Sequence, residues 1–169
     1  MSLSRRHLAI AASLIAASAG AALVRGGARR TRAPQVDYTL LDGRKSNIGQ
    51  LEGQVVLVNF WATSCTTCVG EMPEIVATFE KYRSRGYQTL AVAMRHDPPA
   101  LVADFAENRE LPFGVVIDNT GEIARRFGEV QLTPTSFLID KRGQIVERHV
   151  GVPDFAALHT IIERLLAET

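Results

Sequence analysis

Apolar residues along the chain fall into short continuous runs separated by stretches with helical spacing. The run Val55–Phe60 consists of β-branched and other apolar residues apart from Asn59, the pattern of a strand covered on both faces. The runs 89–93 and 115–117 predict two further buried strands. From Cys65 to about Arg83 the apolar residues recur every three or four positions, which predicts an amphipathic helix. Its expected buried stripe consists of Val69, Met72, Val76 and Phe79.

The segments around these runs complete the pattern. Asp97 precedes two prolines and is expected to cap a helix whose inward face follows. That face would comprise Leu101, Val102, Phe105 and Ala106. The other expected elements are a strand at 36–41 with a return through Ile48 and Leu51, a short helix at 123–127, a hairpin of 135–139 with 144–150, and a helix from about Pro153 carrying Phe155, Leu158, Ile162 and Leu165.

Strands that alternate with helices predict an α/β domain with a central mixed sheet and helices on both faces. We place this domain at 35–169. The chain has 169 residues, 46% of them hydrophobic, which suits one domain with an ordinary core. A formal net charge of +1 gives no electrostatic reason to expect a nucleic-acid partner.

The first 34 residues have a different character. Arg5 and Arg6 precede an uncharged run from Leu8 to Val24, and the whole of 1–24 is interpreted as an export signal or membrane anchor. The arginine pair resembles a twin-arginine signal, with Sec export as the alternative. Residues 25–34 contain four arginines and are interpreted as a basic linker. Export places the protein in the periplasm or on the outer side of a bacterial inner membrane, where disulfides persist.

The only two cysteines, Cys65 and Cys68, lie where the central strand passes into the long helix. A Cys-x-x-Cys at such a junction is a redox motif. Cys65 falls at the helix N-terminus, whose free N–H groups should lower its pKa below the free-thiol range and make it the attacking thiolate. Cys68, one turn further in, suits the resolving role. A static disulfide is the alternative, but a ring of four residues stabilises little.

Several motifs together resemble the TlpA/ResA-type thioredoxin-like proteins. They are Val58–Cys65 with Cys68, Glu71-Met72-Pro73, Leu111-Pro112-Phe113 and Leu132–Asp140. The resemblance covers about 35–167 and implies a thioredoxin-like fold with an N-terminal extension and a helix–strand insertion at 98–117. It also implies an exported thiol-disulfide oxidoreductase, often a reductase serving cytochrome c maturation or copper-site assembly.

The resemblance assigns roles to further residues. It implies that Pro134 is cis and that the Thr133 backbone binds the substrate chain beside the cysteines. It matches Glu71 to a carboxylate that assists proton transfer at Cys68, with a helix-surface glutamate as the alternative. Trp61 is expected to form a packed lid beside the active site on the substrate-binding side, without taking part in the redox chemistry. Asn59 stands where thioredoxin has a buried aspartate, and an amide cannot relay protons in that way.

Two residues depart from the family pattern. Ser64 stands where tryptophan is usual, and Thr66-Thr67 is an uncommon dipeptide between the cysteines. Both departures bear on the redox potential and the direction of electron flow. The expected partners are a protein disulfide substrate and an upstream membrane or periplasmic thiol donor. No cofactor beyond the Cys65–Cys68 disulfide and no metal site is expected.

A copper-binding metallochaperone that uses the same two thiolates is the main alternative function. His96 and His149 stand at no recognisable ligand spacing from the cysteines, and each histidine is expected to be solvated. A peroxidase is disfavoured because Val58 and Ala62 occupy the offsets where a peroxiredoxin needs proline and threonine.

Overall fold

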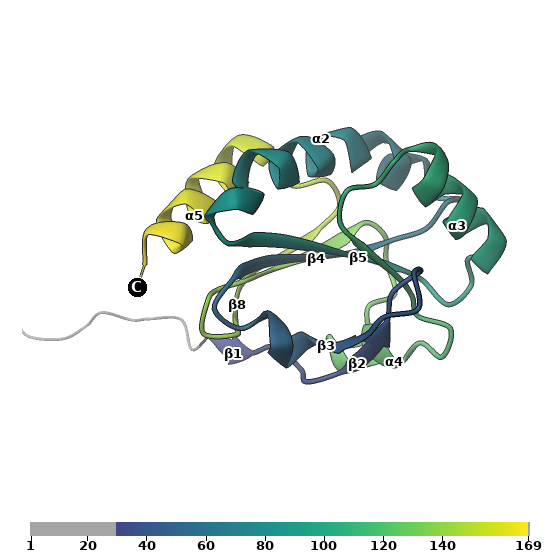
Figure 1. Ribbon diagram of the computed structural model, residues 1–169, viewed down its shortest axis with the longest axis horizontal. Coiled ribbons are helices and arrows are strands. Elements are labelled where there is room, and N and C mark those ends of the chain that lie inside the picture. Colours follow the sequence, from purple (N-terminus) through teal and green to yellow (C-terminus); the bar gives the residue numbers. More distant parts are fainter. Residues whose placement is uncertain (1–29, 169) are drawn as a thin grey trace, which may run out of the picture.

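The apolar run in the first half of the chain forms the middle of the main sheet. Every residue of β4 (Val55–Trp61) is buried. This strand pairs in parallel with β5 (Tyr87–Ala93) and antiparallel with β7 (Thr135–Ile139). The computed structural model describes residues 30–168, and its six-stranded sheet has the order β1-β8-β7-β4-β5-β6 (Figure 1).

The outer strands extend this sheet on both sides. β6 (Gly114–Ile117) adds to β5 in parallel, and β8 (Gln144–Val150) forms the predicted hairpin with β7. The domain begins at an earlier residue than the sequence pattern indicated. β1 (Thr31–Arg32) pairs with β8 at the edge of the sheet, and Ala33 is buried. The last part of the predicted linker is therefore edge strand.

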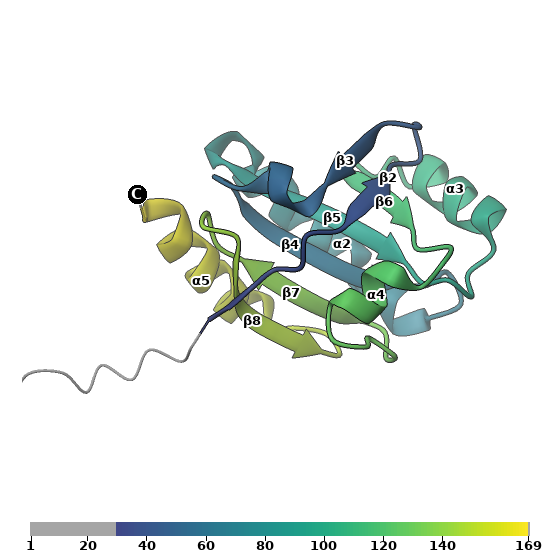
Figure 2. The same ribbon diagram turned by 90° about the horizontal axis from the view of Figure 1, so that it is seen from below.

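Helices cover both faces, which confirms the predicted mixed α/β architecture. On one face lie α2 (Thr66–Tyr82), α3 (Pro99–Asn108) and α5 (Phe155–Ala167). On the other face lie α4 (Glu122–Arg126) and the N-terminal hairpin, seen from below in Figure 2. The one-turn 3-10 helix η2 (Arg83–Arg85) follows α2 and ends at Gly86, whose φ of +89° favours glycine.

The alternation of side chains along the central strand creates two cores. Leu57 and Trp61 face α2 and α5, while Val58 and Phe60 face α4. Asn59 has the same parity as Trp61, so a polar side chain with no exposed surface points into the layer beneath α2. This placement matters for the site described below.

The N-terminal hairpin differs from its prediction. β2 (Asp37–Thr39) pairs with β3 (Lys45–Asn47) in a separate two-stranded sheet. Ile48 and Leu51, expected within a returning strand, lie in the 3-10 helix η1 (Ile48–Leu51). Asn47 caps this helix by accepting a hydrogen bond from Gly49 N–H at 2.7 Å, and this local bond ends the strand.

Two predicted helix faces also need correction. On α2, Ile75 and Tyr82 are buried where Val69 and Val76 are only half-buried, so the stripe is rotated from the predicted one. On α3 the predicted inward residue Leu101 is 52% exposed, and Val102 is the buried one. The spacing of apolar residues alone therefore did not fix which side of either helix faces inward.

The N-terminal predictions concern residues outside those that the structure describes. The export signal at 1–24 and the first part of the linker belong to that segment. Within 30–168, no helix combines the length and the apolar character needed to cross a membrane.

Candidate active site

The two cysteines lie in the turn that joins β4 to α2. Cys65 N–H donates to the carbonyl of Ala62 at 3.1 Å, which closes a turn directly after the strand. Cys65 is the N-cap of α2, and its sulfur accepts a hydrogen bond from Cys68 N–H at 3.1 Å. A sulfur at this position lies at the positive end of the helix dipole, which stabilises a thiolate.

The geometry separates the roles of the two sulfurs. Cys65 and Cys68 form a disulfide, with their Cα atoms 5.2 Å apart. Cys65 is half-buried, whereas Cys68 has no exposed surface. Cys65 is therefore the sulfur that is more accessible to another protein, and Cys68 is the enclosed one.

A second loop approaches the cysteines from the start of β7. The peptide bond between Thr133 and Pro134 is cis, as the sequence motif implied. The carbonyl oxygen of Thr133 lies 3.7 Å from the Cys65 sulfur. The loop is anchored on both sides, because Thr135 donates its hydroxyl to the Leu132 carbonyl at 2.7 Å and Gly151 N–H donates to the Pro134 carbonyl at 2.8 Å. The backbone of Thr133 therefore borders the reactive sulfur.

Glu71 is buried beneath the same helix turn. It follows Cys68 by one turn of α2 and is 3% exposed, so it is not a helix-surface residue. Asn59 Nδ2 donates to Glu71 Oε1 at 3.0 Å and to Ser136 Oγ at 3.0 Å. Burial raises the pKa of Glu71 to about 7, and the hydrogen bond from Asn59 opposes this only in part. The carboxyl group can thus take up or release a proton near neutral pH.

The position of Trp61 differs from the expectation of a cover on the substrate side. The side chain has no exposed surface and packs against Phe105 of α3 with ring centroids 5.0 Å apart. Trp61 points to the same side of β4 as Leu57, which is the side covered by α2, so its ring belongs to the core. In this structure it supports the cysteine turn from beneath and presents nothing to a substrate.

Asp97 has a role that the sequence prediction missed. Pro98, not Asp97, is the N-cap of α3. The carboxylate of Asp97, 3% exposed, instead accepts hydrogen bonds from Thr63 N–H at 2.6 Å and Thr63 Oγ1 at 2.5 Å. It thereby ties the loop after β5 to the turn that carries Cys65. The signal in the sequence was its place in the short loop that follows a buried strand.

The histidines are less uniform than expected. His96 is exposed as predicted. His159 is not freely solvated, because it contacts Thr78 Oγ1 at 2.9 Å and packs edge-on against Tyr82, and burial lowers its pKa. His149 is half-buried on β8 beside Glu147. Among residues 30–168, no three His, Cys, Asp or Glu side chains are arranged to hold a metal ion.

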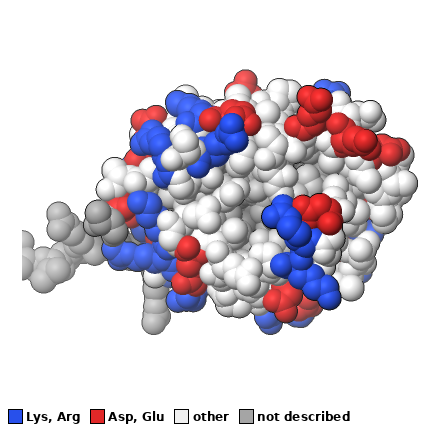
Figure 3. Space-filling model, in the orientation of Figure 1, with Lys and Arg blue, Asp and Glu red and all other residues white. Residues whose placement is uncertain are grey.

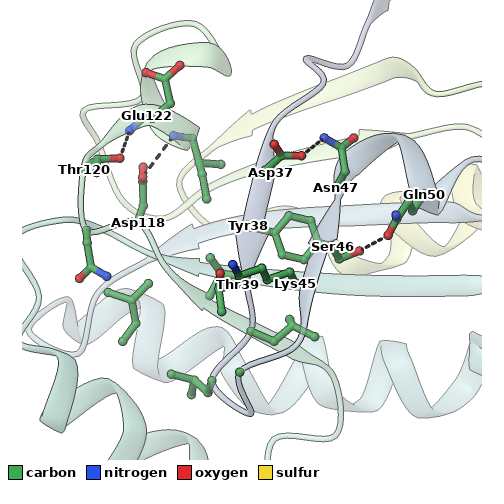
Figure 4. Close-up of a pocket in the computed structure, with 17 residues that line it drawn as sticks. Asp37, Tyr38, Thr39, Lys45, Ser46, Asn47, Gln50, Asp118, Thr120 and Glu122 are labelled. Carbon is green, nitrogen blue, oxygen red and sulfur yellow. Dashed lines mark hydrogen bonds between the residues drawn. The ribbon is translucent and has the colours of Figure 1, made fainter.

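A wide groove lies apart from this chemistry. A groove of about 940 Å³ runs between the β2–β3 hairpin and the end of β6 (Figure 4). Asp37 and Asn47 on its wall bond to each other at 2.6 Å, and Asp118 is engaged by the first N–H groups of α4. None of the cysteine, Glu71 or Thr133 residues lines it. The cysteine turn lies at the protein surface, which suits a macromolecular substrate.

Comparisons with known proteins agree with this geometry. The family model of the redoxins matches residues 28–162. A thiol-disulfide oxidoreductase ResA of Bacillus thuringiensis is 37% identical over 119 residues, which are 70% of this chain and 68% of the relative. A ResA of Bacillus anthracis is 38% identical with the same coverage. The crystal structure of a thioredoxin-family thiol:disulfide interchange protein from Chlorobium tepidum superimposes with a TM-score of 0.75 at 29% identity, covering 83% of this chain and 99% of the other.

Proposed function

This chain belongs to the redoxin family and is a thiol-disulfide oxidoreductase, and on that premise we propose that it reduces disulfides of other proteins outside the cytoplasm. The observation that carries the proposal is the unequal burial of the two sulfurs. Cys65, at the helix N-terminus, faces the surface, and Cys68 is enclosed next to a carboxyl group that titrates near pH 7.

In the proposed reaction the Cys65 thiolate attacks one sulfur of a substrate disulfide. A mixed disulfide forms, and the other substrate sulfur leaves as a thiolate that takes a proton from solvent. Cys68 then passes its S–H proton to Glu71 and attacks the Cys65 sulfur. The Cys65–Cys68 bond forms, the bond between Cys65 and the substrate breaks, and the second substrate sulfur leaves as a thiolate that takes a proton from solvent. Two electrons thus pass from the enzyme to the substrate.

We assign substrate positioning to the loop of Thr133 and Pro134. The Thr133 backbone stands beside the reactive sulfur, with its carbonyl oxygen 3.7 Å away. An extended substrate segment that hydrogen-bonds to this backbone would be held with its disulfide against Cys65. In this scheme Trp61 packs beneath the cysteine turn and does not contact the substrate, because its ring is enclosed.

The proposed location of the protein outside the cytoplasm follows from the sequence. An arginine pair and an uncharged run precede the domain, which supports export and either cleavage or retention as an anchor. A membrane or periplasmic thiol donor would return the disulfide to the dithiol state. Service to cytochrome c maturation or copper-site assembly is the proposed context.

Positive and negative side chains lie beside one another on the face shown in Figure 3, with no continuous basic surface there.

The test is disulfide reduction by the full chain. The reduced protein is mixed with insulin and the released thiols are measured, with Cys65→Ser as the inactive variant and Ser64→Ala as the matched neighbour. We expect loss of activity in Cys65→Ser alone. Equal activity in Cys65→Ser would sink the mechanism. Negligible exchange by the wild type, together with stoichiometric retention of Cu(I) by its dithiol, would instead favour the metallochaperone.

A further inference from the structure

Unpartnered buried polar atoms gather in one layer of the molecule. Among residues 30–168, five buried side-chain nitrogen or oxygen atoms have no hydrogen-bond partner. They are Asn59 Oδ1, Trp61 Nε1, Glu71 Oε2, Glu147 Oε2 and His149 Nε2. Such atoms are rare in folded proteins and are usually served by ordered water. A cluster of them on one side of a sheet indicates a polar seam within an apolar layer.

The strand register places this seam in a straight row. Asn59 on β4 is directly opposite Ser136 on β7, and Ser136 is directly opposite His149 on β8. Directly opposed residues share a face of the sheet, here the face beneath α2 and α5. Neighbouring strands are about 4.8 Å apart, so the row from Asn59 to His149 covers roughly 10 Å.

The inner end of the row is the carboxyl group of Glu71. Asn59 Nδ2 donates to Glu71 Oε1 and to Ser136 Oγ, each at 3.0 Å. Both amide hydrogens are therefore used, and the hydroxyl hydrogen of Ser136 remains free to donate. Glu71 Oε1 and Ser136 Oγ, which both accept from Asn59 Nδ2, are about 5 Å apart because the two N–H bonds diverge. One water can bridge that span.

The outer end of the row reaches solvent. The side chain of His149 is 23% exposed, although its Nε2 is enclosed and lies 3.3 Å from the enclosed Oε2 of Glu147, whose side chain is 31% exposed. Glu71 and Cys68, by contrast, are enclosed, so neither passes a proton directly to bulk water. The reaction nevertheless leaves one proton on Glu71 for every disulfide reduced.

We propose that His149, held beside Glu147, is the group through which the buried Glu71 exchanges its proton with solvent. This inference rests on the proposed function of Glu71. The proton of the Cys68 thiol goes to the Glu71 carboxylate, then by way of bridging water and the Ser136 hydroxyl to the imidazole, and from there to solvent. No electrons move in these steps, and Glu71 returns to its carboxylate form. His149 acts through Glu71 and touches no substrate.

The test measures proton exchange at Glu71 itself. The oxidised full chain is labelled with ¹³C at glutamate side-chain carboxyls, and the rate of exchange between the two protonation states is taken from line shapes near pH 7. We expect His149→Gln to slow this exchange by roughly a hundredfold, the lower end of what positioned proton-transfer groups contribute. Ser136→Ala should slow it as well. His96→Gln, which alters an exposed histidine outside the row, is the matched control.

Imidazole added to His149→Gln should restore the exchange rate, which a purely structural role of His149 would not allow. Exchange as fast as wild type in His149→Gln would overturn the proposal, and so would slow exchange that imidazole leaves unchanged. Should His149→Gln not fold, Ser136→Ala and Glu147→Gln give the same comparison. Because the measurement uses the disulfide form, its failure leaves insulin reduction intact, whereas failure of the proposed function abolishes that activity in the wild type.

Discussion

Replacing Glu71 with glutamine tests whether the buried carboxyl group is neutral at physiological pH. Glutamine has nearly the shape of a protonated glutamate but carries no charge at any pH. Its carbonyl oxygen can accept from Asn59 Nδ2, as Glu71 Oε1 does. The variant therefore preserves the packing and removes only the titration.

The magnitude follows from the change in proton affinity on folding. Burial raises the pKa of Glu71 from its ordinary value of 4.5 to about 7. Each tenfold change in affinity is worth about 1.4 kcal/mol, so the carboxyl group contributes a pH-dependent term of about 3 kcal/mol. The folded protein binds this proton more tightly than the unfolded chain. The stabilisation is thus fully present below pH 4.5 and is lost as the pH rises through 7.

The assay is urea unfolding of the oxidised wild type and Glu71→Gln at intervals from pH 4.5 to 8.5. Near pH 4.5 the two free energies of unfolding should agree to within about 1 kcal/mol, the scale of one altered hydrogen bond. Above pH 7 the variant should be more stable by about 3 kcal/mol. Glu74→Gln, at an exposed position on the same helix, should show no such trend. A difference between Glu71→Gln and wild type that stays constant with pH would refute the reasoning.

Three further predictions concern the support of the site and the competing function. Asp97→Ala should lower the free energy of unfolding by about 1–3 kcal/mol, because Thr63 loses a buried acceptor, and should slow insulin reduction; Asp104→Ala at the surface of α3 serves as control. Leu158→Ala should cost about 2–5 kcal/mol in urea unfolding by opening a cavity beneath α5, with activity per folded molecule unchanged, and a cost below 1 kcal/mol would contradict the packing. The reduced chain should lose Cu(I) to a competing chelator during dialysis, and tight one-to-one retention would argue for copper transfer.

Elements with a clear periodicity could be predicted from the sequence. β4 is apolar except for Asn59 and lies in the middle of the sheet, and the β7–β8 hairpin surrounds the predicted turn. The cis bond before Pro134 and the burial of Cys68 also follow the motifs. In each case the local sequence pattern favours the same structure that the overall fold requires.

The rest depends on contacts between distant segments. Asp97 has the pattern of a helix cap, yet a backbone N–H and a hydroxyl of Thr63, 34 residues earlier, bind its carboxylate. Ile48 has the pattern of a strand residue, but the Asn47 side chain bonds to the backbone and starts a 3-10 turn. The row from Asn59 to His149 joins three strands and is visible only once their register is known.

The central claim is that Cys65 attacks the substrate and Cys68 resolves the mixed disulfide. The most direct measurement is the Cys68→Ser variant, reduced and then mixed with a protein disulfide substrate, followed by mass spectrometry of the adduct after digestion. The account predicts a stable one-to-one mixed disulfide mapped to the peptide containing Cys65, and none with Cys65→Ser. An adduct on Cys68 in the Cys65→Ser variant, or no adduct with Cys68→Ser, would contradict it.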